Sequence, residues 1–335
     1  MKAIVLSAFG SADNLHDAEL PNPALRPGDV RIKVSAIAFN PVDFQVRMGR
    51  RESKNANSMI LGRDLAGTVD DVYPGVAGFN VGDEVFCNVN KLATSGTYAE
   101  YVCVPAELVA KKPTSLSHEQ AAAVPVAATT ALLALRKAQV GPGKSVFIGG
   151  GAGGVGTFAL GLARQLGART LFTTAGSAKS RAYLVEQCGL HDEQIIDYRS
   201  PDFEALAMQR NGGGFDSVVD LVGGGMLSSC SALVGVEGNL ASVTEAPTQA
   251  DFDILFDKNA SFHPVGANAY SLMPDRRSWL KYRDMLDHLS QLFDSGALAP
   301  APITNLGTFS AAVVKRAHAL MENNTVQGKL VMTCP

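Results

Sequence analysis

The first part of the chain, up to about residue 113, alternates apolar and polar positions between short turn sequences. From Val30 to Ala36 every second residue is apolar, and the residues between them are Arg31, Lys33 and Ser35. This two-residue period is typical of a strand that buries one face. Glycine, proline and aspartate recur in the turns between such runs. Short strands between turns of this kind predict a compact antiparallel barrel or sandwich.

In the middle of the chain, from about residue 117 to residue 266, strand-like apolar runs alternate with helix-like stretches. Repeated β–α units of this spacing predict a parallel sheet with helices on both faces. Six strand candidates would complete a dinucleotide-binding sheet. They are residues 145–148, 170–174, 194–197, 216–222, 239–243 and 262–265, and the helical stretches between them include 156–166, 177–188 and 226–234.

The last part of the chain begins with a long helix whose apolar residues recur at spacings of three and four. Gly296 is placed to end this helix, and a second helix and a final strand follow. We expect this tail to pack back on the first part, so that residues 1–121 and 268–335 form one domain and residues 122–267 are inserted into it. The apolar stripe of the long helix consists of Trp279, Tyr282, Leu286, Leu289 and Phe293.

Size and charge narrow the function. At 335 residues the chain exceeds the usual size of one hydrophobic core, so two domains are expected. The formal net charge of −3 gives no sign of the basic face of a nucleic-acid-binding protein. No apolar run reaches the length of about 20 residues that crosses a bilayer. We therefore expect small-molecule partners, and neither nucleic acid nor membrane.

Cysteine and histidine usage gives no sign of a metal site or of disulfides. The five cysteines are scattered and form no Cys-x-x-Cys pair, and the six histidines form no pair at ligand spacing. The first residues, MKAIVLSAFG, are typical of a first β-strand rather than of a signal peptide. A reducing cytoplasm is the expected compartment.

A glycine-rich loop follows the first strand of the middle part, and Gly151, Gly153 and Gly156 occupy the three glycine positions of G-x-G-x-x-G. In such a loop Gly151 would allow the tight turn, Gly153 would let the backbone approach a pyrophosphate, and Gly156 would let helix and strand pack closely. The N–H groups at the start of the following helix, which include those of Gly154 and Val155, would face the phosphates. Because a strand precedes the loop and a helix follows it, we interpret it as a dinucleotide site rather than as a flexible loop.

The residues after the next strand indicate which dinucleotide binds. An NAD-binding enzyme places an acidic residue there, about 20 residues beyond the loop, to bind the ribose 2′-hydroxyl. Here the sequence reads Ala175-Gly176-Ser177, and Lys179 and Arg181 follow. A hydroxyl and two cations in place of the acid favour NADPH, whose 2′-phosphate they would bind. The alternative is that the two cations form the solvated face of the next helix.

Several short segments in a fixed order carry a resemblance over nearly the whole chain. Besides the glycine loop they are NPVD at 40–43, GRDLAG at 62–67, VGDEV at 81–85, GTYAEY at 96–101, AATTA at 127–131, IDYR at 196–199 and QGKLV at 327–331. In these segments the chain resembles the zinc-independent quinone oxidoreductases of the medium-chain dehydrogenase/reductase superfamily. The resemblance implies an α/β protein with a GroES-like β-barrel catalytic domain, an inserted Rossmann domain and a cleft between them.

The resemblance also implies that no metal takes part. Zinc alcohol dehydrogenases of the same superfamily use a Cys, a His and a Glu from the first two of these segments. Here Asn40, Arg63 and Asp64 stand at those positions. A guanidinium cannot bind zinc, and the four clustered cysteines of a structural zinc lobe are absent from the sequence. We therefore expect no zinc.

Without a metal, the feasible reaction is hydride delivery from NADPH to a carbon made electrophilic by conjugation, as in a quinone or an α,β-unsaturated carbonyl. The resemblance makes Asn40 the candidate donor to the substrate oxygen, although an Asn before Pro41 is also typical of a turn. Arg63 is a second candidate for polarising this oxygen, and the alternative is that it pairs with Asp43 or Asp64. A proton, with water as one candidate source, would complete the reduction.

Further cofactor contacts are implied by the resemblance. Thr130 matches a position near the nicotinamide, and Tyr198 matches one near the 2′-phosphate, although a Tyr that ends a strand is often only a packing residue. The last strands of the Rossmann sheet usually line the nicotinamide pocket. Val243, Val265 and Gly266 fall there, and Val222 and Lys329 are also assigned to the cofactor.

Departures from the family pattern leave the substrate open. Gly161 replaces a common Gln, Lys179 lies one residue earlier than in some relatives, and residues 50–57 lack the tyrosines that several relatives place over the substrate. The last point makes an enoyl-thioester reductase less favoured. The alternatives to a quinone or enone reductase are a metal-free reductase of simple ketones and an NADPH-binding protein without significant catalysis.

Oligomeric state is predicted from the last strand of the middle part. The strand at 262–265 would lie at the edge of its sheet, where relatives often pair, so we expect a homodimer. Pro264 would interrupt such pairing locally.

Overall fold

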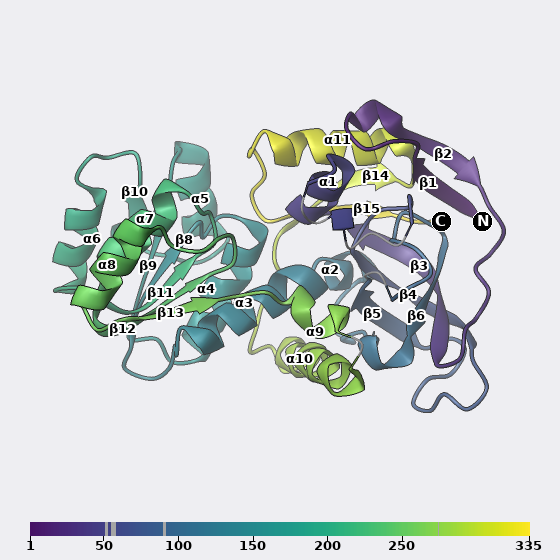
Figure 1. The fold of residues 1–335 in the computed structure, drawn as a ribbon. Coiled ribbons are helices and arrows are strands. Elements are labelled where there is room, and N and C mark those ends of the chain that lie inside the picture. The colour runs from purple at the N-terminus through teal and green to yellow at the C-terminus, as the bar shows by residue number, and fades with distance from the viewer. Residues whose placement is uncertain (51–52, 55–57, 90–91, 274) are drawn as a thin grey trace. The chain divides into compact units, whose positions relative to one another are not determined.

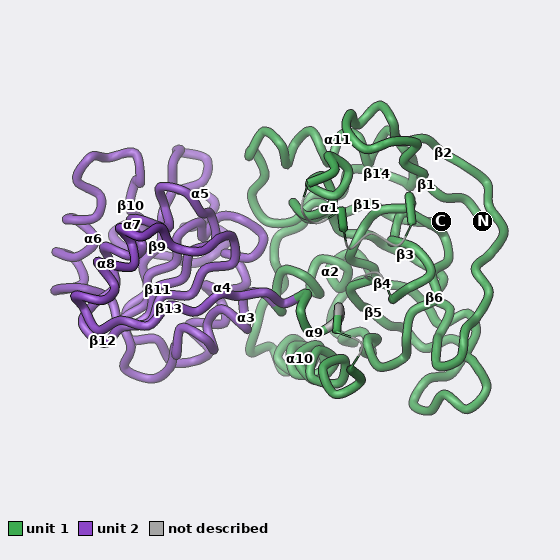
Figure 2. The backbone as a smooth tube through the Cα atoms, viewed as in Figure 1, with its two compact units in different colours: residues 1–129, 268–335 green, residues 130–267 purple. Residues whose placement is uncertain are grey.

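The described residues form two compact units. Unit 1 consists of residues 1–129 and 268–335, and unit 2 consists of residues 130–267 (Figure 2). Each unit is built on its own sheet. No helix in the described part of the chain is both long enough and apolar enough to pass through a membrane. The computed structural model describes residues 1–50, 53–54, 58–89, 92–273 and 275–335.

Within its described residues, unit 1 is built on a seven-stranded, mainly antiparallel sheet. The alternating pattern at residues 30–36 belongs to β3 (Asp29–Ala38), which pairs with β4 (Asp64–Val72). The C-terminal strand β15 (Lys329–Thr333) is antiparallel to β3, so the tail packs on the first part of the chain as predicted. The other strands of the sheet are β5 (Glu84–Asn88), β6 (Tyr101–Pro105), β7 (Ala110–Lys111) and β14 (Ile303–Thr308), and β1 (Lys2–Leu6) pairs separately with β2 (Leu15–Glu19).

The register of this sheet gathers polar residues at one end. Asp64, the first residue of β4, is opposite Ala38 of β3 and opposite Asn88 of β5. Residues opposite each other in an antiparallel pair have side chains on the same face. Asn40 follows the end of β3, and Lys329 begins β15. The candidate site residues of unit 1 therefore come from three segments that the sheet holds in register, at the end of β3 and at the starts of β4 and β15.

The helices of unit 1 bury apolar faces. In α10 (Arg276–Asp294), four of the five residues predicted for the apolar stripe are buried. Trp279 is only half-buried, and its Nε1 donates a hydrogen bond to the Met273 carbonyl at 2.6 Å. Gly296, with a φ of +72°, follows the helix as predicted. The other helices are α1 (Pro41–Arg47), α2 (His118–Ala122), α9 (Asn268–Leu272) and α11 (Ala311–Glu322), with single 3₁₀ turns at Ala12–Asn14 and Ala106–Leu108.

A buried hydrogen-bond network joins α11 to the first part of the chain. The His318 ring is fully buried, its Nδ1 accepts from Arg47 Nε at 3.1 Å, and its Nε2 lies 3.0 Å from the Tyr98 hydroxyl. Arg47 also pairs with Glu322. Burial, assisted by the charge of Arg47, lowers the pKa of His318 to about 3. The ring is therefore neutral at neutral pH and stabilises the fold through hydrogen bonds.

Unit 2, which the structure describes completely, is a six-stranded parallel sheet with the strand order β10-β9-β8-β11-β12-β13. This confirms the predicted Rossmann fold, because the order is that of two β–α–β–α–β halves that meet between β8 and β11. Helices α6, α7 and α8 pack side by side (Figure 1). The strands are β8 (Ser145–Gly149), β9 (Thr170–Ala175), β10 (Ile195–Asp197), β11 (Phe215–Asp220), β12 (Val234–Ser242) and β13 (Ser261–Pro264). The helices are α4 (Gly154–Gln165), α5 (Ala178–Glu186), α6 (Phe203–Asn211), α7 (Gly225–Leu233) and α8 (Gln249–Asp257), with a 3₁₀ turn at Asp192–Gln194, and α3 (Pro125–Lys137) carries the chain from unit 1 into unit 2.

The core of unit 2 fixes the strands that carry the glycine loop. Phe215 of β11 is fully buried, and its ring lies 5.4 Å from that of Phe147 in β8 and 5.6 Å from that of Phe172 in β9. Tilted aromatic pairs at these separations are favourable beyond their buried area. These ring contacts hold β8, β9 and β11 together, and the glycine loop follows β8 directly.

Candidate active site

The glycine loop connects β8 to α4 at the carboxyl edge of the parallel sheet. Gly150 has a φ of +90°, so the left-handed residue of the turn is Gly150 and not Gly151, which corrects the role predicted for Gly151. Gly151 must lack a side chain because a methyl group there would lie 2.2 Å from Thr173 Oγ1. A methyl group on Gly156 would lie 2.3 Å from the Gly150 carbonyl oxygen. The start of α4 therefore packs against the loop more closely than any side chain allows.

Two threonines of β9, which the sequence motif did not reveal, hold the loop in place. Thr174 Oγ1 accepts from the Gly150 N–H and Thr173 Oγ1 accepts from the Gly151 N–H, both at 3.1 Å. Gly153 is the N-cap of α4, and its N–H donates to the Gly150 carbonyl at 3.2 Å. The N–H groups of the first helical turn have no acceptor within the helix. At this position they are suited to bind an anion.

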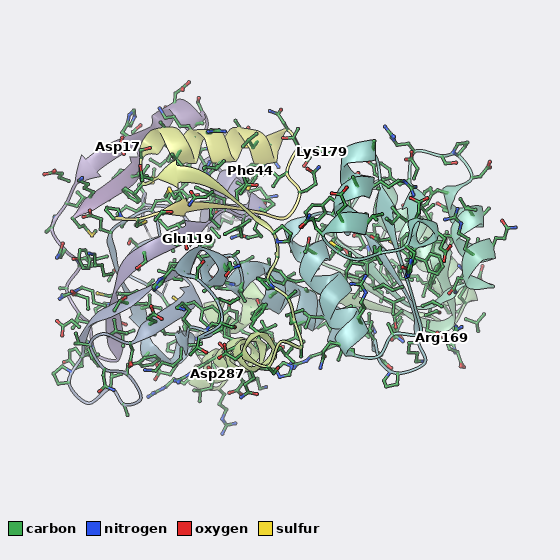
Figure 3. The ribbon with its side chains drawn as sticks, turned by 180° about the vertical axis from the view of Figure 1, so that it is seen from behind. Asp17, Phe44, Glu119, Arg169, Lys179 and Asp287 are labelled. Carbon is green, nitrogen blue, oxygen red and sulfur yellow. The ribbon has the colours of Figure 1, made fainter. Side chains whose placement is uncertain are left out.

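The predicted 2′-phosphate position lies just beyond β9. Ser177 is the N-cap of α5, and its Oγ accepts from the Ser180 N–H at 3.1 Å. The Tyr198 ring packs on Gly176 so closely that a methyl group there would lie 2.5 Å from the ring, and the Tyr198 side chain remains 47% exposed. Lys179, labelled in Figure 3, is exposed on the first turn of α5. Tyr198 thus packs on Gly176, Ser177 is the next residue along the chain, and Lys179 follows two residues later on α5.

Arg181, which was also predicted to bind the phosphate, has other partners. Its NH1 donates to Asp192 Oδ1 at 2.6 Å, and its NH2 donates to the Ile195 carbonyl at 3.1 Å. The guanidinium therefore ties α5 to the start of β10. We assign Arg181 to the structure of unit 2 and omit it from the phosphate-binding set.

The residues assigned to the nicotinamide end of the cofactor lie just after the last three strands. Val222 follows β11, Val243 follows β12, and Val265 and Gly266 follow β13. Because the strands are parallel, these positions share the edge of the sheet from which the glycine loop emerges. A methyl group on Gly150 would lie 2.8 Å from Val222 Cγ2, so this side chain covers the turn. Thr130 lies on α3 and is half-buried.

Asp220, which the sequence motifs did not reveal, organises this edge. Its Oδ1 accepts from the Val222 and Gly223 N–H groups, both at 3.0 Å. Its Oδ2 accepts from Ser242 Oγ at 2.8 Å and from Thr244 Oγ1 at 3.1 Å. This fully buried carboxylate therefore joins the loops after β11 and β12.

A second set of candidate residues forms a buried polar cluster in unit 1, which we call the Asn40 cluster. The Asn40 Nδ2 donates to Asp64 Oδ2 at 2.8 Å, and Lys329 Nζ donates to Asn40 Oδ1 at 2.6 Å. The Asn40 backbone N–H donates to Asp43 Oδ2 at 2.8 Å. All the members are less than a tenth exposed. The cluster consists of Asn40, Asp43, Arg63, Asp64 and Lys329.

Lys329 was predicted to contact the cofactor, and in the structure its ammonium is bound to groups of unit 1. Its Nζ donates to the Phe39 carbonyl at 3.0 Å as well as to Asn40, and it lies 3.8 Å from Asp64 Oδ2. Only 4% of the residue is exposed. The ammonium is enclosed by groups of unit 1, which the local spacing of the C-terminal segment could not reveal.

Burial shifts the two carboxyl groups of the cluster toward neutrality. Burial raises the pKa of Asp64 to about 6, while Lys329, Asn40 and the Val126 N–H at the start of α3 oppose this shift. Burial raises the pKa of Asp43 to about 7, opposed by the Asn40 N–H and by the charge of Arg63. Asp43 Oδ1 has no hydrogen-bond partner among the described residues. The cluster therefore holds two acids whose pKa values are raised by burial, and the charges of Lys329 and Arg63 oppose this shift only in part.

Arg63 lies where its charge lowers the pKa of both Asp43 and Asp64. Its NH1 also donates to the Val89 carbonyl at 3.4 Å. The charge of Arg63 therefore acts on both carboxyl groups, and its contact with a substrate belongs to the proposal below.

The Asn40 cluster does not suit a zinc ion. The Asn40 amide oxygen faces an ammonium, and Asp64 is engaged by Asn40 and by the Val126 N–H. Two cations in the same cluster would repel a further positive charge. In the described part of the chain, His, Cys, Asp and Glu side chains form no group of three or more that could hold a metal.

Comparisons with known proteins agree with this geometry. Residues 26–114 match the family model described as alcohol dehydrogenase GroES-like domain, and residues 190–332 match the one described as zinc-binding dehydrogenase. The chain is 32% identical to 2-methylene-furan-3-one reductase of Solanum lycopersicum over 99% of its own length and 79% of the relative. It is 30% identical, with the same coverage, to the chloroplastic NADPH-dependent alkenal/one oxidoreductase of Arabidopsis thaliana. Among solved structures, the quinone oxidoreductase from Coxiella burnetii has a TM-score of 0.83 and 33% identity, with 99% of this chain and 98% of that chain covered.

Proposed function

Because this chain belongs to the enone and quinone oxidoreductases of the medium-chain dehydrogenase/reductase superfamily, we propose that it is an NADPH-dependent, zinc-independent reductase of quinones or α,β-unsaturated carbonyls. The observation that carries this proposal is the composition of the Asn40 cluster. It offers hydrogen-bond donors and cations but no suitable set of zinc ligands. Such a site can stabilise a developing negative charge on oxygen, whereas it cannot activate an alcohol as a metal would.

The glycine loop is the proposed pyrophosphate site. The N–H groups of Gly154, Val155 and Gly156 begin α4 and can donate to phosphate oxygens. Gly153 has room for close approach, since a methyl group there would be 3.5 Å from its nearest neighbour, the Gly150 carbonyl oxygen. When bound, NADPH would supply the hydride for the reduction. The nicotinamide end is proposed to lie along the loops after β11, β12 and β13.

Ser177, Lys179 and Tyr198 are the proposed ligands of the 2′-phosphate. They follow the ends of β9 and β10, and Ser177 and Lys179 stand close in sequence to the position at which NAD-binding enzymes present a carboxylate. The substitution of hydroxyl groups and an ammonium for a carboxylate favours a phosphate over a free ribose hydroxyl.

Asn40 is the proposed catalytic residue. One Nδ2 hydrogen is engaged by Asp64, so the second is available for the carbonyl oxygen of a substrate. This hydrogen bond would strengthen as the oxygen gains negative charge during the reduction. Arg63 is proposed to assist through its charge, and a proton from water would complete the product.

The test is a steady-state assay of NADPH oxidation with a panel of quinones, alkenals and simple ketones, together with metal analysis of the purified protein. We expect turnover with conjugated acceptors, weak or no turnover with simple ketones, a lower KM for NADPH than for NADH, and no stoichiometric zinc. Tight NADPH binding without turnover of any acceptor would contradict the proposal and favour a binding protein. Stoichiometric zinc required for activity would contradict the metal-free chemistry.

We propose a homodimer that forms along the edge strand β13. Next to this edge a hollow is lined mainly by apolar side chains, and Phe256 is 86% exposed. Its lining residues are Phe252, Leu255, Phe256, Ala260 and Phe262, together with Gln249 and Asp253. An exposed aromatic surface beside an unpaired strand edge is suited to association with a second copy. Sedimentation of the wild type and of Phe256→Asp tests this, and a monomeric wild type would contradict it.

We propose a reducing compartment such as the cytoplasm. The five cysteines are free and buried. Burial raises the pKa of each thiol, so the reactive thiolate is disfavoured. Fractionation of the host cell with an antibody to the protein tests the compartment.

A further inference from the structure

The Asn40 side chain is held at both ends by groups of opposite charge. Its Oδ1 accepts from the Lys329 ammonium at 2.6 Å, and its Nδ2 donates to the Asp64 carboxylate at 2.8 Å. An ammonium can only donate hydrogen bonds, and an ionised carboxylate can only accept them. A flipped amide would bring its NH₂ group against Lys329 and its oxygen against Asp64. The two partners therefore permit one orientation of the Asn40 amide.

Lys329 is itself fixed by the backbone of the sheet. Its Nζ donates to the Phe39 carbonyl at 3.0 Å, and the Phe39 N–H donates to the Leu330 carbonyl at 3.0 Å. Strand β15 is in register with β3, with Val331 opposite Ala38. The ammonium thus reaches Asn40 from a neighbouring strand whose position does not depend on a flexible loop.

Packing alone does not account for a lysine at this position. A buried ammonium loses several kcal/mol of hydration, and an apolar side chain of similar size is often as stable in such a site. Here the only side-chain atoms within hydrogen-bond distance of Nζ, among the described residues, belong to Asn40. The charge therefore acts on the Asn40 amide through a direct hydrogen bond and on the Asp64 carboxylate at 3.8 Å.

We propose that Lys329 is a positioning residue for the reduction, which orients the Asn40 amide and polarises it toward the substrate oxygen. This inference rests on the proposed function, in which Asn40 donates to that oxygen. With Oδ1 bound to Lys329 and one Nδ2 hydrogen bound to Asp64, the second hydrogen has one fixed direction. The positive charge of the Lys329 ammonium, hydrogen-bonded to the amide oxygen, also makes this hydrogen a stronger donor, since linked hydrogen bonds polarise one another.

The test is a double-mutant cycle on kcat with Lys329→Met, Asn40→Ala and the double variant. We expect Asn40→Ala to lower kcat about a hundredfold, as loss of one oxyanion donor does. Lys329→Met should lower kcat about tenfold, which is an ordinary coupling between residues in contact. In the Asn40→Ala background, Lys329→Met should change kcat little, because its effect passes through Asn40. Lys329→Gln, which keeps a donor without the charge, should fall between wild type and Lys329→Met.

The cofactor supplies a second readout, because the KM for NADPH should stay the same in Lys329→Met. An equal loss of kcat in both backgrounds, or a raised KM for NADPH in Lys329→Met, would overturn the proposal. Urea unfolding midpoints of all variants show which of them are folded. If Lys329→Met does not fold, the same comparisons are made with Lys329→Gln.

A third readout does not depend on activity. In protein labelled with ¹⁵N-asparagine, the side-chain amide signal of Asn40 is assigned by its loss in Asn40→Ala. We expect this signal to shift in Lys329→Gln, and an unchanged signal would contradict the proposed orientation. If the wild type reduces no quinone or enone, the proposed function fails, while the amide signal still tests whether Lys329 orients Asn40.

Discussion

The glycine loop of unit 2 and the Asn40 cluster of unit 1 are built in opposite ways. The loop is a run of neighbouring residues between β8 and α4, and the absence of side chains gives it its form. The cluster gathers residues as far apart in sequence as Asn40 and Lys329, separated by 289 positions, and its charged side chains give it its form. The glycine loop should therefore be sensitive to added side-chain volume. The Asn40 cluster should be sensitive to the loss of a charged group.

The largest loss of stability is expected from a substitution in the Asn40 cluster. Asp64→Ala should lower the free energy of unfolding by about 3–5 kcal/mol, because it leaves Lys329 without its buried counter-charge. Urea denaturation measures this change. Asp287→Ala in α10 is the control: its pair with Arg283 is partly exposed, with 3.5 Å between the charged atoms, so a change of about 1 kcal/mol or less is expected. Equal changes in the two variants would show that the buried Asp64 carboxylate contributes no more to stability than a partly exposed one.

An added methyl group should destabilise the loop at Gly156 but not at Gly153. Gly156→Ala should lower the free energy of unfolding by about 1–3 kcal/mol, because the methyl group would overlap the Gly150 carbonyl. Gly153→Ala should leave stability nearly unchanged, since its φ of −77° suits alanine and its surroundings have room. Both variants should weaken NADPH binding, measured by calorimetry beside thermal unfolding. Normal NADPH affinity in Gly153→Ala would argue against close approach of the pyrophosphate.

The pH dependence of stability should separate the His318 network from the carboxyl groups. Burial lowers the pKa of His318 from 6.5 to about 3, so between these values the unfolded chain binds a proton that the folded chain does not. His318 therefore makes stability fall as pH falls through this range, by up to about 1.4 kcal/mol per pH unit. The raised pKa values of Asp43 and Asp64 act in the opposite direction, since the folded state binds their protons more tightly.

His318→Gln isolates the histidine contribution, because the carboxyl groups are common to both proteins. The difference in unfolding free energy between wild type and variant should shrink as pH falls from 6.5 to about 3. Urea titrations at several pH values measure it. A difference that stays constant over this range would show that the folded protein binds the histidine proton normally.

The smallest effect is expected at the 2′-phosphate. Lys179→Ala should raise the KM for NADPH about fivefold, equivalent to about 1 kcal/mol, because an exposed ion pair is weak. The KM for NADH should stay the same. Arg181→Ala is the matched control, since its guanidinium is bound to Asp192 and Ile195, and it should alter neither KM. A larger effect from Arg181 than from Lys179 would reverse the assignment made from the structure.

The fold and the loop could be predicted because their signals are local. The alternation in β3, the stripe in α10 and the strand–glycine–helix order around Gly151 each lie within a short window of sequence. Details of the loop required coordinates. Gly150 rather than Gly151 makes the turn, and the hydroxyl groups that hold it come from Thr173 and Thr174 on the next strand.

The cluster was predicted only in part. The sequence pointed to Asn40 and Arg63 and to the absence of zinc ligands, but it assigned Lys329 to the cofactor. It also assigned Arg181 to the 2′-phosphate together with Lys179, because the sequence does not show which of two nearby cations has a partner within the protein. Their partners, Asn40 for Lys329 and Asp192 for Arg181, are set by which strands and helices lie next to them.

The sequence by itself determined the order of elements, the inserted parallel sheet and the lack of side chains in the glycine loop, because backbone period and residue size act over a few positions. Only the tertiary structure decided which charged groups share a buried site and which direction the Asn40 amide faces. Electrostatic interactions between buried groups depend on distance in space and on exclusion of water. The register of the sheet sets both the distances between these groups and their exclusion from water. No short stretch of sequence specifies that register.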